Sequence, residues 1–492
     1  MFRPSDPQRK LFDAGGLLSA RQREECEKSW AGPFRQHCLP ILRGIEEEFA
    51  DLFDPKMGRP NRPVALVVGA LVLKEMKDYT DEETMEALQF DARWWYAFEL
   101  EPHDERVCPK TLYNFRQGLL EHQDKKKKKL AFRRVTDQLI ESLGVKVERQ
   151  RLDSKHILSN IAILTRLGLF SETIRVFLRE AKRIHPKAYE ALGAGLLKRH
   201  GEESHYADAR KAEGPRRLGV VARDVGRLVA RFEDDPAVNS TAEWKLLWRL
   251  YQEQCDPTLD PEEPGKDDDD HGEGGVCVAL RESKQVSGDS LQTPHDPTVE
   301  YSGHKGKGFE AQIAETIVAT NPVQLITEVE VTRSSKTDLE ALVPMVQRLK
   351  EAGHKPEELA ADTGFSGAKN AAELAKEGVN LLAPCPAVAK PDPQKAYPLP
   401  EAKCPTEEKA AGEWLRQQEA SPTFAQRYAI RAGSEATNSE LARAHGMDKL
   451  RVRGKARVKL AVYFKALACN VKRALRYWLQ KSKPTEGTAC LA

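Results

Sequence analysis

The sequence predicts an α/β protein in which a mixed β-sheet is flanked by helices and follows a helical N-terminal region. Two observations support this fold class. Apolar residues recur at helical spacing in the first 145 residues. From residue 146 onward, strand patterns alternate with helix patterns. Strands that are joined by helices form sheets whose faces the helices cover.

The length of the chain indicates more than one domain. Its 492 residues exceed what a single hydrophobic core usually serves. We expect a helical domain at 1–145, a second domain at 146–482 and a flexible tail at 483–492. Insertions are expected in the second domain at about 164–275 and about 384–420.

Composition argues against a membrane or secreted protein. The N-terminus carries no apolar signal segment, and the longest apolar run, Val64–Leu73, is too short to span a bilayer. Nine cysteines are scattered without a Cys-x-x-Cys pair, as is typical of reduced thiols in the cytoplasm. The net charge of +2 does not by itself indicate a nucleic-acid-binding protein, so the local distribution of charge must show whether the chain binds nucleic acid.

The N-terminal region contains clear helix signals. Thr80 and Glu83 form a capping box, and Pro109 opens a helix with one apolar face made of Leu112, Phe115 and Leu119. Short helices with tight polar joints are typical of a helix-turn-helix-like bundle that binds DNA, and equally of a helical packing domain. The five lysines at 125–129 are either a phosphate-contacting linker or merely solvated.

The second domain begins with a predicted buried strand at 151–157 that carries Asp153. A charged helical stretch at about 164–254 follows, and it ends in an acidic segment at 256–275 that we expect to be a flexible loop. A hairpin is predicted from the alternating patterns at 309–317 and 324–332, which Asn321-Pro322 connects.

The remaining pattern predicts helix, strand, helix and strand in turn. An amphipathic helix at 338–349 should bury five apolar residues, after which Gly353 ends it. These are Leu339, Leu342, Val343, Val346 and Leu349. A short strand at 359–362 ends in an acid, a helix covers 368–377, and another strand covers 379–383. An irregular segment at 384–405 precedes helices at 427–443 and 457–479.

Two acidic residues stand where a catalytic sheet would place them. Asp153 lies inside a predicted strand, and Asp362 lies at the carboxyl end of another. If these strands are neighbours, the two carboxylates converge and need a cation between them. Oxygen ligands without nearby His or Cys favour Mg²⁺ or Mn²⁺.

A third carboxylate would complete such a site, and the late helix offers Glu435 and Glu440. Arg431 and Glu435 share one helix face, with Tyr428 one turn earlier, which favours Glu435. Taken singly, each acid is more often a cap, a salt-bridge partner or a solvated residue than a catalytic group. The predicted order of strands and helices, which would bring the acids together, favours the catalytic interpretation.

Several motifs resemble the bacterial insertion-sequence transposases of the DDE class. The spacing Tyr428-x2-Arg431-x3-Glu435 resembles the Tyr-x2-Arg-x3-Glu signature of that family. Further segments resemble its two aspartate strands, its intervening motifs and its C-terminal helix. These are 152–154, 361–365, 295–297, 303–308 and 431–441. The N-terminal region resembles the family's helical transposase domain, so the resemblance covers most of the chain except the insertions and the ends.

The resemblance implies a ribonuclease-H-like core with Asp153, Asp362 and Glu435 as metal-binding catalytic residues. The implied reaction is metal-dependent cleavage of DNA at the element ends, followed by strand transfer. Two Mg²⁺ or Mn²⁺ ions about 3.5–4 Å apart would serve it, with Asp153 bridging both ions and Asp362 and Glu435 each holding one.

The implied partners are double-stranded DNA, at element ends and target, and further copies of the chain in a homodimer or larger assembly. The implied location is the cytoplasm, in association with the nucleoid. Tyr428 and Arg431 are the expected DNA contacts beside the acids, and Lys305 and Lys307 in a Gly-rich turn are expected contacts to the DNA backbone.

One position departs from the family pattern. The family often carries Lys seven residues after its Glu, whereas this chain has Ala442, and the adjacent Arg443 could substitute in DNA binding. Some relatives carry a cysteine cluster before the last acid. Here that interval holds only Cys385 and Cys404, too few for a four-ligand zinc site.

Three alternatives stay open on sequence grounds. Asp362-Thr363-Gly364 matches the aspartic protease tripeptide, but that class needs a second copy or a dimer of small β-rich units, and the chain has no second copy. A catalytically inactive DNA-binding regulator derived from a transposase, and a ribonuclease-H-like nuclease, would share the same core.

Overall fold

The computed structural model describes residues 1–5, 18–100, 107–208, 212–256 and 278–482. At its centre is a mixed sheet in the spatial order β6-β5-β1-β7-β8, with the short β4 also paired to β5. The strands are β1 (Arg149–Ile157), β4 (Glu300–Ser302), β5 (Gly306–Thr316), β6 (Ile326–Arg333), β7 (Glu358–Ala360) and β8 (Asn380–Leu382).

Strand direction divides this sheet into two parts. β1, β5 and β6 pair antiparallel, whereas β7 and β8 run parallel to β1. The predicted hairpin is thus β5–β6, and Asn321 at its turn donates from its side-chain amide to the carbonyl of Lys146 at 2.9 Å. The mixed sheet of the ribonuclease-H-like fold is therefore confirmed.

One face of the sheet is covered by α16 (Asp338–Glu351) and α17 (Ala368–Lys376), and α18 (Glu408–Ala420) packs on α17. Their shared core includes Leu152, Leu359 and Leu381 from three strands. One detail of the sequence prediction was wrong. Leu339 is 45% exposed because the first turn of α16 carries it to the protein surface. α18 lies in the second predicted insertion, after its irregular part at 384–405.

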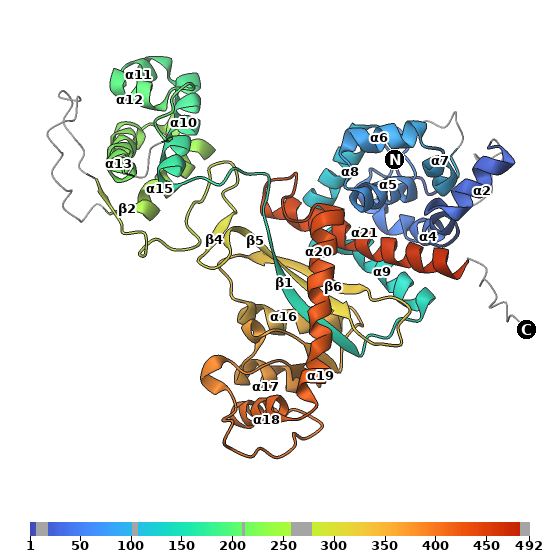
Figure 1. The fold of residues 1–492 in the computed structure, drawn as a ribbon. Coiled ribbons are helices and arrows are strands. Elements are labelled where there is room, and N and C mark those ends of the chain that lie inside the picture. Colours follow the sequence, from blue (N-terminus) through green and yellow to red (C-terminus); the bar gives the residue numbers. More distant parts are fainter. Residues whose placement is uncertain (6–17, 101–106, 209–211, 257–277, 483–492) are drawn as a thin grey trace, which may run out of the picture.

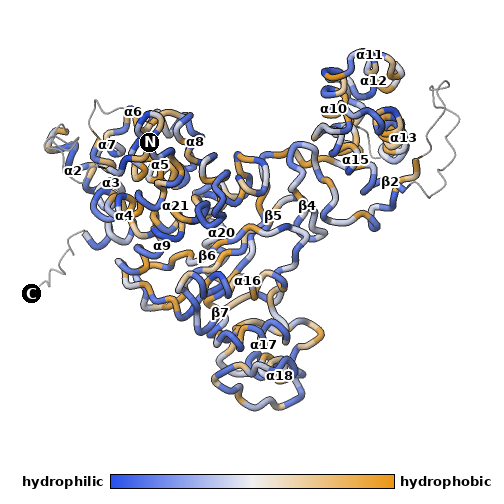
Figure 2. The backbone as a smooth tube through the Cα atoms, turned by 180° about the vertical axis from the view of Figure 1, so that it is seen from behind, coloured by the Kyte–Doolittle hydropathy of each residue, from blue (hydrophilic) through white to orange (hydrophobic). Residues whose placement is uncertain are grey.

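The other face meets α9 (Leu130–Leu143), α20 (Gly433–His445) and the long α21 (Lys455–Lys481). Figure 1 shows α20 crossing β1 and α21 reaching from the sheet into the N-terminal bundle. One continuous core joins β5, β6, α21 and the N-terminal helices. Apolar segments gather inside the bundle and along the central strands (Figure 2).

The N-terminal helices are α2 (Ala20–Lys28), α3 (Ala31–Pro33), α4 (Leu39–Gly44), α5 (Val64–Lys77), α6 (Asp81–Phe90), α7 (Ala92–Phe98) and α8 (Pro109–Glu121). The predicted capping box opens α6. The Glu83 amide donates to Thr80 Oγ1 at 3.1 Å, and the Thr80 amide donates to Glu83 Oε2 at 2.6 Å. Pro109 opens α8 as predicted, and the apolar face of that helix is buried.

The lysine run forms a short 3₁₀ helix, Lys125–Lys129, and only part of it faces solvent. Lys127 Nζ lies 2.8 Å from Asp51 Oδ1, and Lys129 Nζ donates to the Val329 carbonyl at 2.7 Å. Burial lowers the pKa of Lys129 to about 7. Lys129 thus joins this segment to β6, Lys127 contacts the N-terminal region, and of the five lysines Lys125 and Lys126 are fully exposed.

A helical insertion after β1 forms a separate lobe that projects away from the sheet (Figure 1). It consists of α10 (Arg166–Ile184), α11 (Pro186–Glu190), α12 (Ala194–His200), α13 (Gly214–Phe232), α14 (Pro236–Asn239) and α15 (Ala242–Gln254). The lobe has a hydrophobic core of its own. The pair β2 (Cys255–Asp256) and β3 (Ala279–Leu280) closes its base. Nearly all of the predicted acidic loop, and the predicted tail, lie outside the described residues.

Candidate active site

The topology brings Asp153 and Asp362 to neighbouring strands. Asp153 is a buried residue of β1, and β7, which runs parallel to β1, leads directly into Asp362. Asp362 caps the 3₁₀ turn Thr363–Phe365, where its Oδ1 accepts from the Gly364 amide at 2.8 Å. A helix follows this turn, in contrast to the β-rich unit that an aspartic protease would require.

Arg431 joins the two aspartates. Its Nη2 lies 3.0 Å from Asp153 Oδ1 and 3.5 Å from Asp362 Oδ2. Burial opposes the charge of Arg431, but the two carboxylates outweigh it and raise the pKa of the guanidinium. Because one nitrogen reaches both carboxylates, they converge closely enough to share a cation.

Tyr428 lies beside this ion pair, in the short α19 (Phe424–Tyr428). Its ring stacks on Phe424 with 5.3 Å between the ring centroids. Burial is the main cause that raises the pKa of Tyr428, and Asp362 and Asp153 act in the same direction. The phenol therefore stays protonated near neutral pH and is able to donate a hydrogen bond.

Glu435 lies between two residues that contact Asp153. Arg431 stands one turn before it, and Asn438 one turn after it, on the same helix face. Asn438 Nδ2 donates to Asp153 Oδ2 at 3.0 Å. Glu435 itself is exposed and, within the described ranges, forms no hydrogen bond or ion pair. The structure therefore brings Asp153 and Asp362 together, but among the described residues the Glu435 carboxylate contacts neither of them.

Glu440 occupies a different environment. It lies five residues after Glu435, so its side chain is rotated by about 140° around the helix. Its Oε2 lies 3.0 Å from Arg473 Nε, and its Oε1 lies 3.3 Å from Lys472 Nζ. Burial disfavours its charge, but Arg473 and Lys472 lower the pKa of Glu440 overall. The side chain thus connects α20 to α21, away from the aspartates.

A buried acid of β5, Glu315, fixes α20 on the sheet. It accepts from Arg151 Nε at 2.8 Å and from the Thr437 hydroxyl at 2.8 Å, and it pairs with Arg473. A Cβ on Gly433 would lie 2.0 Å from Arg151 Nη1, so α20 begins with a glycine because the guanidinium passes directly beneath it. Sequence reasoning missed Glu315 and Asn438. The only signals were an acid at a buried strand position and an amide three residues after Glu435.

The two lysines expected to contact DNA already have protein partners. Lys305 Nζ lies 3.0 Å from Glu310 Oε2 and 2.9 Å from Ser154 Oγ, next to Asp153 in the chain. Lys307 Nζ donates to the Leu164 carbonyl at 2.7 Å, and burial lowers the pKa of Lys307. Arg443, by contrast, is exposed and has no partner among the described residues.

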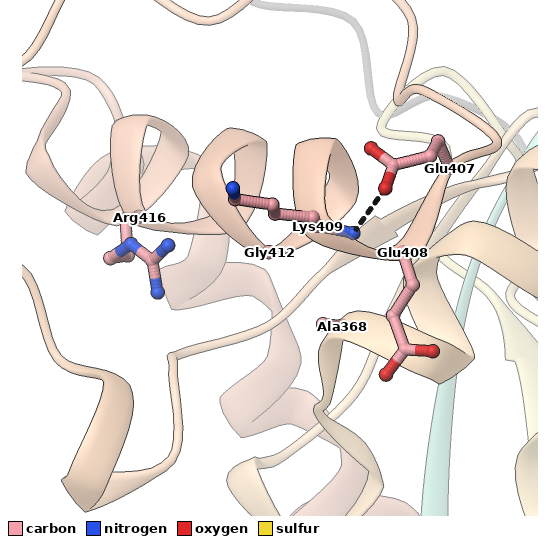
Figure 3. Close-up of a pocket in the computed structure, with 6 residues that line it drawn as sticks. All are labelled: Ala368, Glu407, Glu408, Lys409, Gly412 and Arg416. Carbon is pink, nitrogen blue, oxygen red and sulfur yellow. Dashed lines mark hydrogen bonds between the residues drawn. The ribbon is translucent and has the colours of Figure 1, made fainter.

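A shallow pocket of about 380 Å³ lies at the surface between α17 and α18, away from the aspartates. Figure 3 shows its charged lining, in which the Glu407 carboxylate accepts from the Lys409 backbone amide. This contact caps α18, and none of the acids named above lines the pocket. The carboxylate cluster on the sheet is therefore the better candidate for chemistry.

Two family models match the chain. One, described as a Transposase DDE domain, matches residues 288–471. The other, described as a Transposase domain (DUF772), matches residues 36–118. The chain belongs to the insertion-sequence transposases of the DDE class. The two matches together cover just over half of the transposase.

The DDE match includes β5, β6, Asp362 and Glu435, and it ends within α21. Asp153 and the helical lobe lie before it in the transposase. No curated protein and no solved structure matches the chain. Across the described segments, no helix combines the length and apolarity that crossing a membrane requires.

Proposed function

We propose that this transposase cleaves DNA at the ends of its element and joins those ends to target DNA, with Asp153, Asp362 and Glu435 as the metal-binding carboxylates. The observation that carries the proposal is the shared guanidinium of Arg431, which lies 3.0 Å from Asp153 and 3.5 Å from Asp362. Two convergent carboxylates that pair with one cation are suited to hold a metal ion in its place. Glu435, on the helix that contacts Asp153 through Asn438, is the proposed third ligand.

The chemistry of the cluster fits a hard divalent cation. The three candidate ligands are all carboxylates, and neither His nor Cys is among them, which favours Mg²⁺ or Mn²⁺. When bound, two such ions lower the pKa of an attacking oxygen and stabilise the leaving oxygen. Asp153, Asp362 and Glu435 are the residues that would hold these ions.

The protein's own residues position the reacting groups. Asn438 holds one oxygen of Asp153, so the carboxylate keeps its orientation. The Arg431 guanidinium offers planar donors to a phosphate oxygen, and Tyr428 offers a hydroxyl. Water attacks the phosphorus at the element end, and the bond that breaks releases a 3′-hydroxyl. That hydroxyl then attacks a target phosphodiester, which releases a target 3′-hydroxyl without a covalent bond to protein.

Further DNA contacts are proposed outside the acids. The exposed Arg443 is free to meet a phosphate, whereas Lys305 and Lys307 would first have to leave their present partners. The N-terminal helices are the proposed DNA-binding domain. Because two element ends must be brought together, the active assembly is proposed to contain at least two copies.

The test is element-end cleavage and joining by three single variants, Asp153→Ala, Asp362→Ala and Glu435→Ala. Loss of a metal ligand removes several kcal/mol of transition-state stabilisation, so each rate should fall by about a hundredfold or more. Glu408→Ala, at an exposed acid of α18, is the control and should keep full activity. A variant that cleaves at the unsubstituted rate would remove its residue from the site.

The same assay separates the alternatives. Cleavage without joining would identify a nuclease. Specific binding to the ends without cleavage in Mg²⁺ would identify an inactive regulator. Cleavage and joining together support the transposase proposal.

A further inference from the structure

A second cluster of ligand-type side chains lies at the far end of α20, where that helix meets α21 and α5. Glu440 and His445 come from α20, and Cys469 comes from α21. One ligand atom from each lies within 4.8 Å of the others. We propose that these three residues bind a transition-metal ion of the zinc class, separate from the ions proposed at the aspartates.

His445 presents an unused lone pair to this cluster. The residue is fully buried, and its Nδ1 lies 2.9 Å from the Glu75 carbonyl oxygen. A carbonyl only accepts, so Nδ1 carries the proton and Nε2 is left as a bare acceptor. That Nε2 is buried and has no hydrogen-bond partner within the described chain.

An imidazole in this state is arranged as a metal ligand. Burial lowers the pKa of His445 to about 4, so the ring is neutral at physiological pH. Histidines that bind metals commonly donate their other N–H to a backbone carbonyl, which fixes the tautomer and the ring orientation. The Glu75 carbonyl of α5 provides that contact. A buried imidazole nitrogen without a partner is otherwise costly.

The distance between the other two ligand atoms also fits. Cys469 Sγ lies 3.6 Å from Glu440 Oε2. Around a tetrahedral zinc ion, bond lengths of about 2.3 Å to sulfur and about 2.0–2.2 Å to oxygen place those two atoms about 3.5–3.7 Å apart. A nitrogen, sulfur and oxygen donor set suits Zn²⁺ better than Mg²⁺.

The cations beside the cluster are each paired with an acid. Glu440 pairs with Arg473 through Oε2 at 3.0 Å, and with Lys472 and Arg476 through Oε1 at 3.3 and 3.6 Å. Arg473 also pairs with Glu315, and Lys465 pairs with Glu75 at 2.6 Å. On binding, the Cys469 thiol loses its proton to solvent, and the thiolate adds one negative charge.

An ion here would fasten α20 in place. Glu440 and His445 lie near the C-terminal end of the helix whose first turns carry Glu435 and Asn438. Bridging them to Cys469 fixes α20 against α21, in addition to the Glu315 contacts on the sheet. The ion would be structural, and the proposal does not depend on the catalytic roles of the aspartates.

The test is the metal content of the purified full-length chain after loading with Zn²⁺ and dialysis against metal-free buffer. About one zinc ion per chain is expected, and Asp153→Ala should retain it, which separates this site from the proposed catalytic one. Cys469→Ser and His445→Gln should reduce the zinc content to near zero. Cys108→Ser, at an exposed cysteine, is the matched control and should keep the ion.

Loading with Co²⁺ provides a readout that needs no variant. Thiolate ligation gives a sulfur-to-cobalt charge-transfer band, and the unsubstituted chain should show it. Circular dichroism checks that each variant is folded, and Glu440→Gln replaces any variant that is not. The proposal is overturned if the folded chain takes up no zinc, if the cobalt band is absent, or if Cys469→Ser and His445→Gln both retain zinc.

Discussion

Asp153 is held from two sides. Arg431 contacts Oδ1 and Asn438 contacts Oδ2, both at 3.0 Å. The arginine neutralises the carboxylate, whereas the amide only orients it. Because both contacts come from the chain segment that also carries Glu435, the orientation of Asp153 and the position of Glu435 are coupled.

Removing Asn438 should therefore impair chemistry more than binding. In Asn438→Ala, Asp153 loses a charge-assisted hydrogen bond worth about 1.5–3 kcal/mol, so kcat for end cleavage should fall about tenfold or more. The affinity for element-end DNA should stay unchanged, which gel-shift titration measures. Asn438→Gln, which keeps the amide, should recover part of kcat. An unchanged kcat in Asn438→Ala would contradict a positioning role.

The sequence allowed the two aspartates to be proposed but not the residues that hold them. Asp153 and Asp362 stand on recognisable strands, and the Tyr428–Arg431 spacing separated Glu435 from Glu440. Asn438 could not be singled out, since a polar residue on a helix is usually solvated. That Asp153, Asp362 and Glu435 bind the catalytic metal ions stays a prediction.

At the scale of elements, α20 is the helix that completes the candidate site, and its position depends on Glu315. That acid is 2% exposed and contacts Arg151, Thr437 and Arg473. Helix bounds were predictable where capping residues mark them, as at Thr80 and Pro109. The packing of α20 on β5 was not predictable from the sequence, because this packing depends on ion pairs between residues far apart in the sequence.

Glu315→Ala should destabilise the fold strongly. It leaves the buried Arg151 guanidinium without its acid and removes one of the two acids of Arg473, and breaking such a network costs about 3–5 kcal/mol. Urea denaturation measures the change in unfolding free energy. Glu413→Ala, at a partly exposed ion pair with Arg416 on α18, should change it by less than about 1 kcal/mol. A midpoint in Glu315→Ala equal to that of the unsubstituted chain would show that α20 is held by other contacts.

At the scale of the whole molecule, the N-terminal helices and the sheet share one hydrophobic core, whereas the lobe α10–α15 has its own. The lobe was expected from sequence only as an insertion. Its separate core could not be inferred, since helical spacing shows which face is apolar but not which partner covers it. We expect the lobe to unfold independently of the rest.

Calorimetry of two core variants tests this expectation. Phe177 is fully buried in the lobe, and Leu467 is fully buried in α21. Each large-to-small change costs about 2–5 kcal/mol. Phe177→Ala should lower only one unfolding transition, and Leu467→Ala should lower only the other. A single transition that both variants lower alike would contradict separate units.

The contact between α5 and α21 should make stability depend on pH. Burial disfavours the charge of Glu75, but Lys465 and Lys74 outweigh it and lower the pKa of Glu75 to about 2. A depressed pKa in the folded state stabilises the fold above the ordinary pKa near 4.5, and this stabilisation is lost as the pH falls from there toward 2.

Glu75→Gln isolates this contribution. The variant should be less stable than the unsubstituted chain at pH 6, by an amount on the order of 3 kcal/mol. The difference should shrink as the pH falls below 4.5, which urea denaturation at a series of pH values measures. A difference that stays constant down to pH 2 would exclude the charge of Glu75 as its cause.

The central claim is that Asp153 binds a divalent ion during DNA cleavage, and a metal-specificity switch tests it most directly. In Asp153→Cys, a soft thiolate replaces a hard carboxylate, which disfavours Mg²⁺ more than Mn²⁺. The measurement is the rate of element-end cleavage in each metal. We predict almost no cleavage in Mg²⁺ and a clear recovery in Mn²⁺. Cleavage in Mg²⁺ at the rate of the unsubstituted transposase would contradict the account.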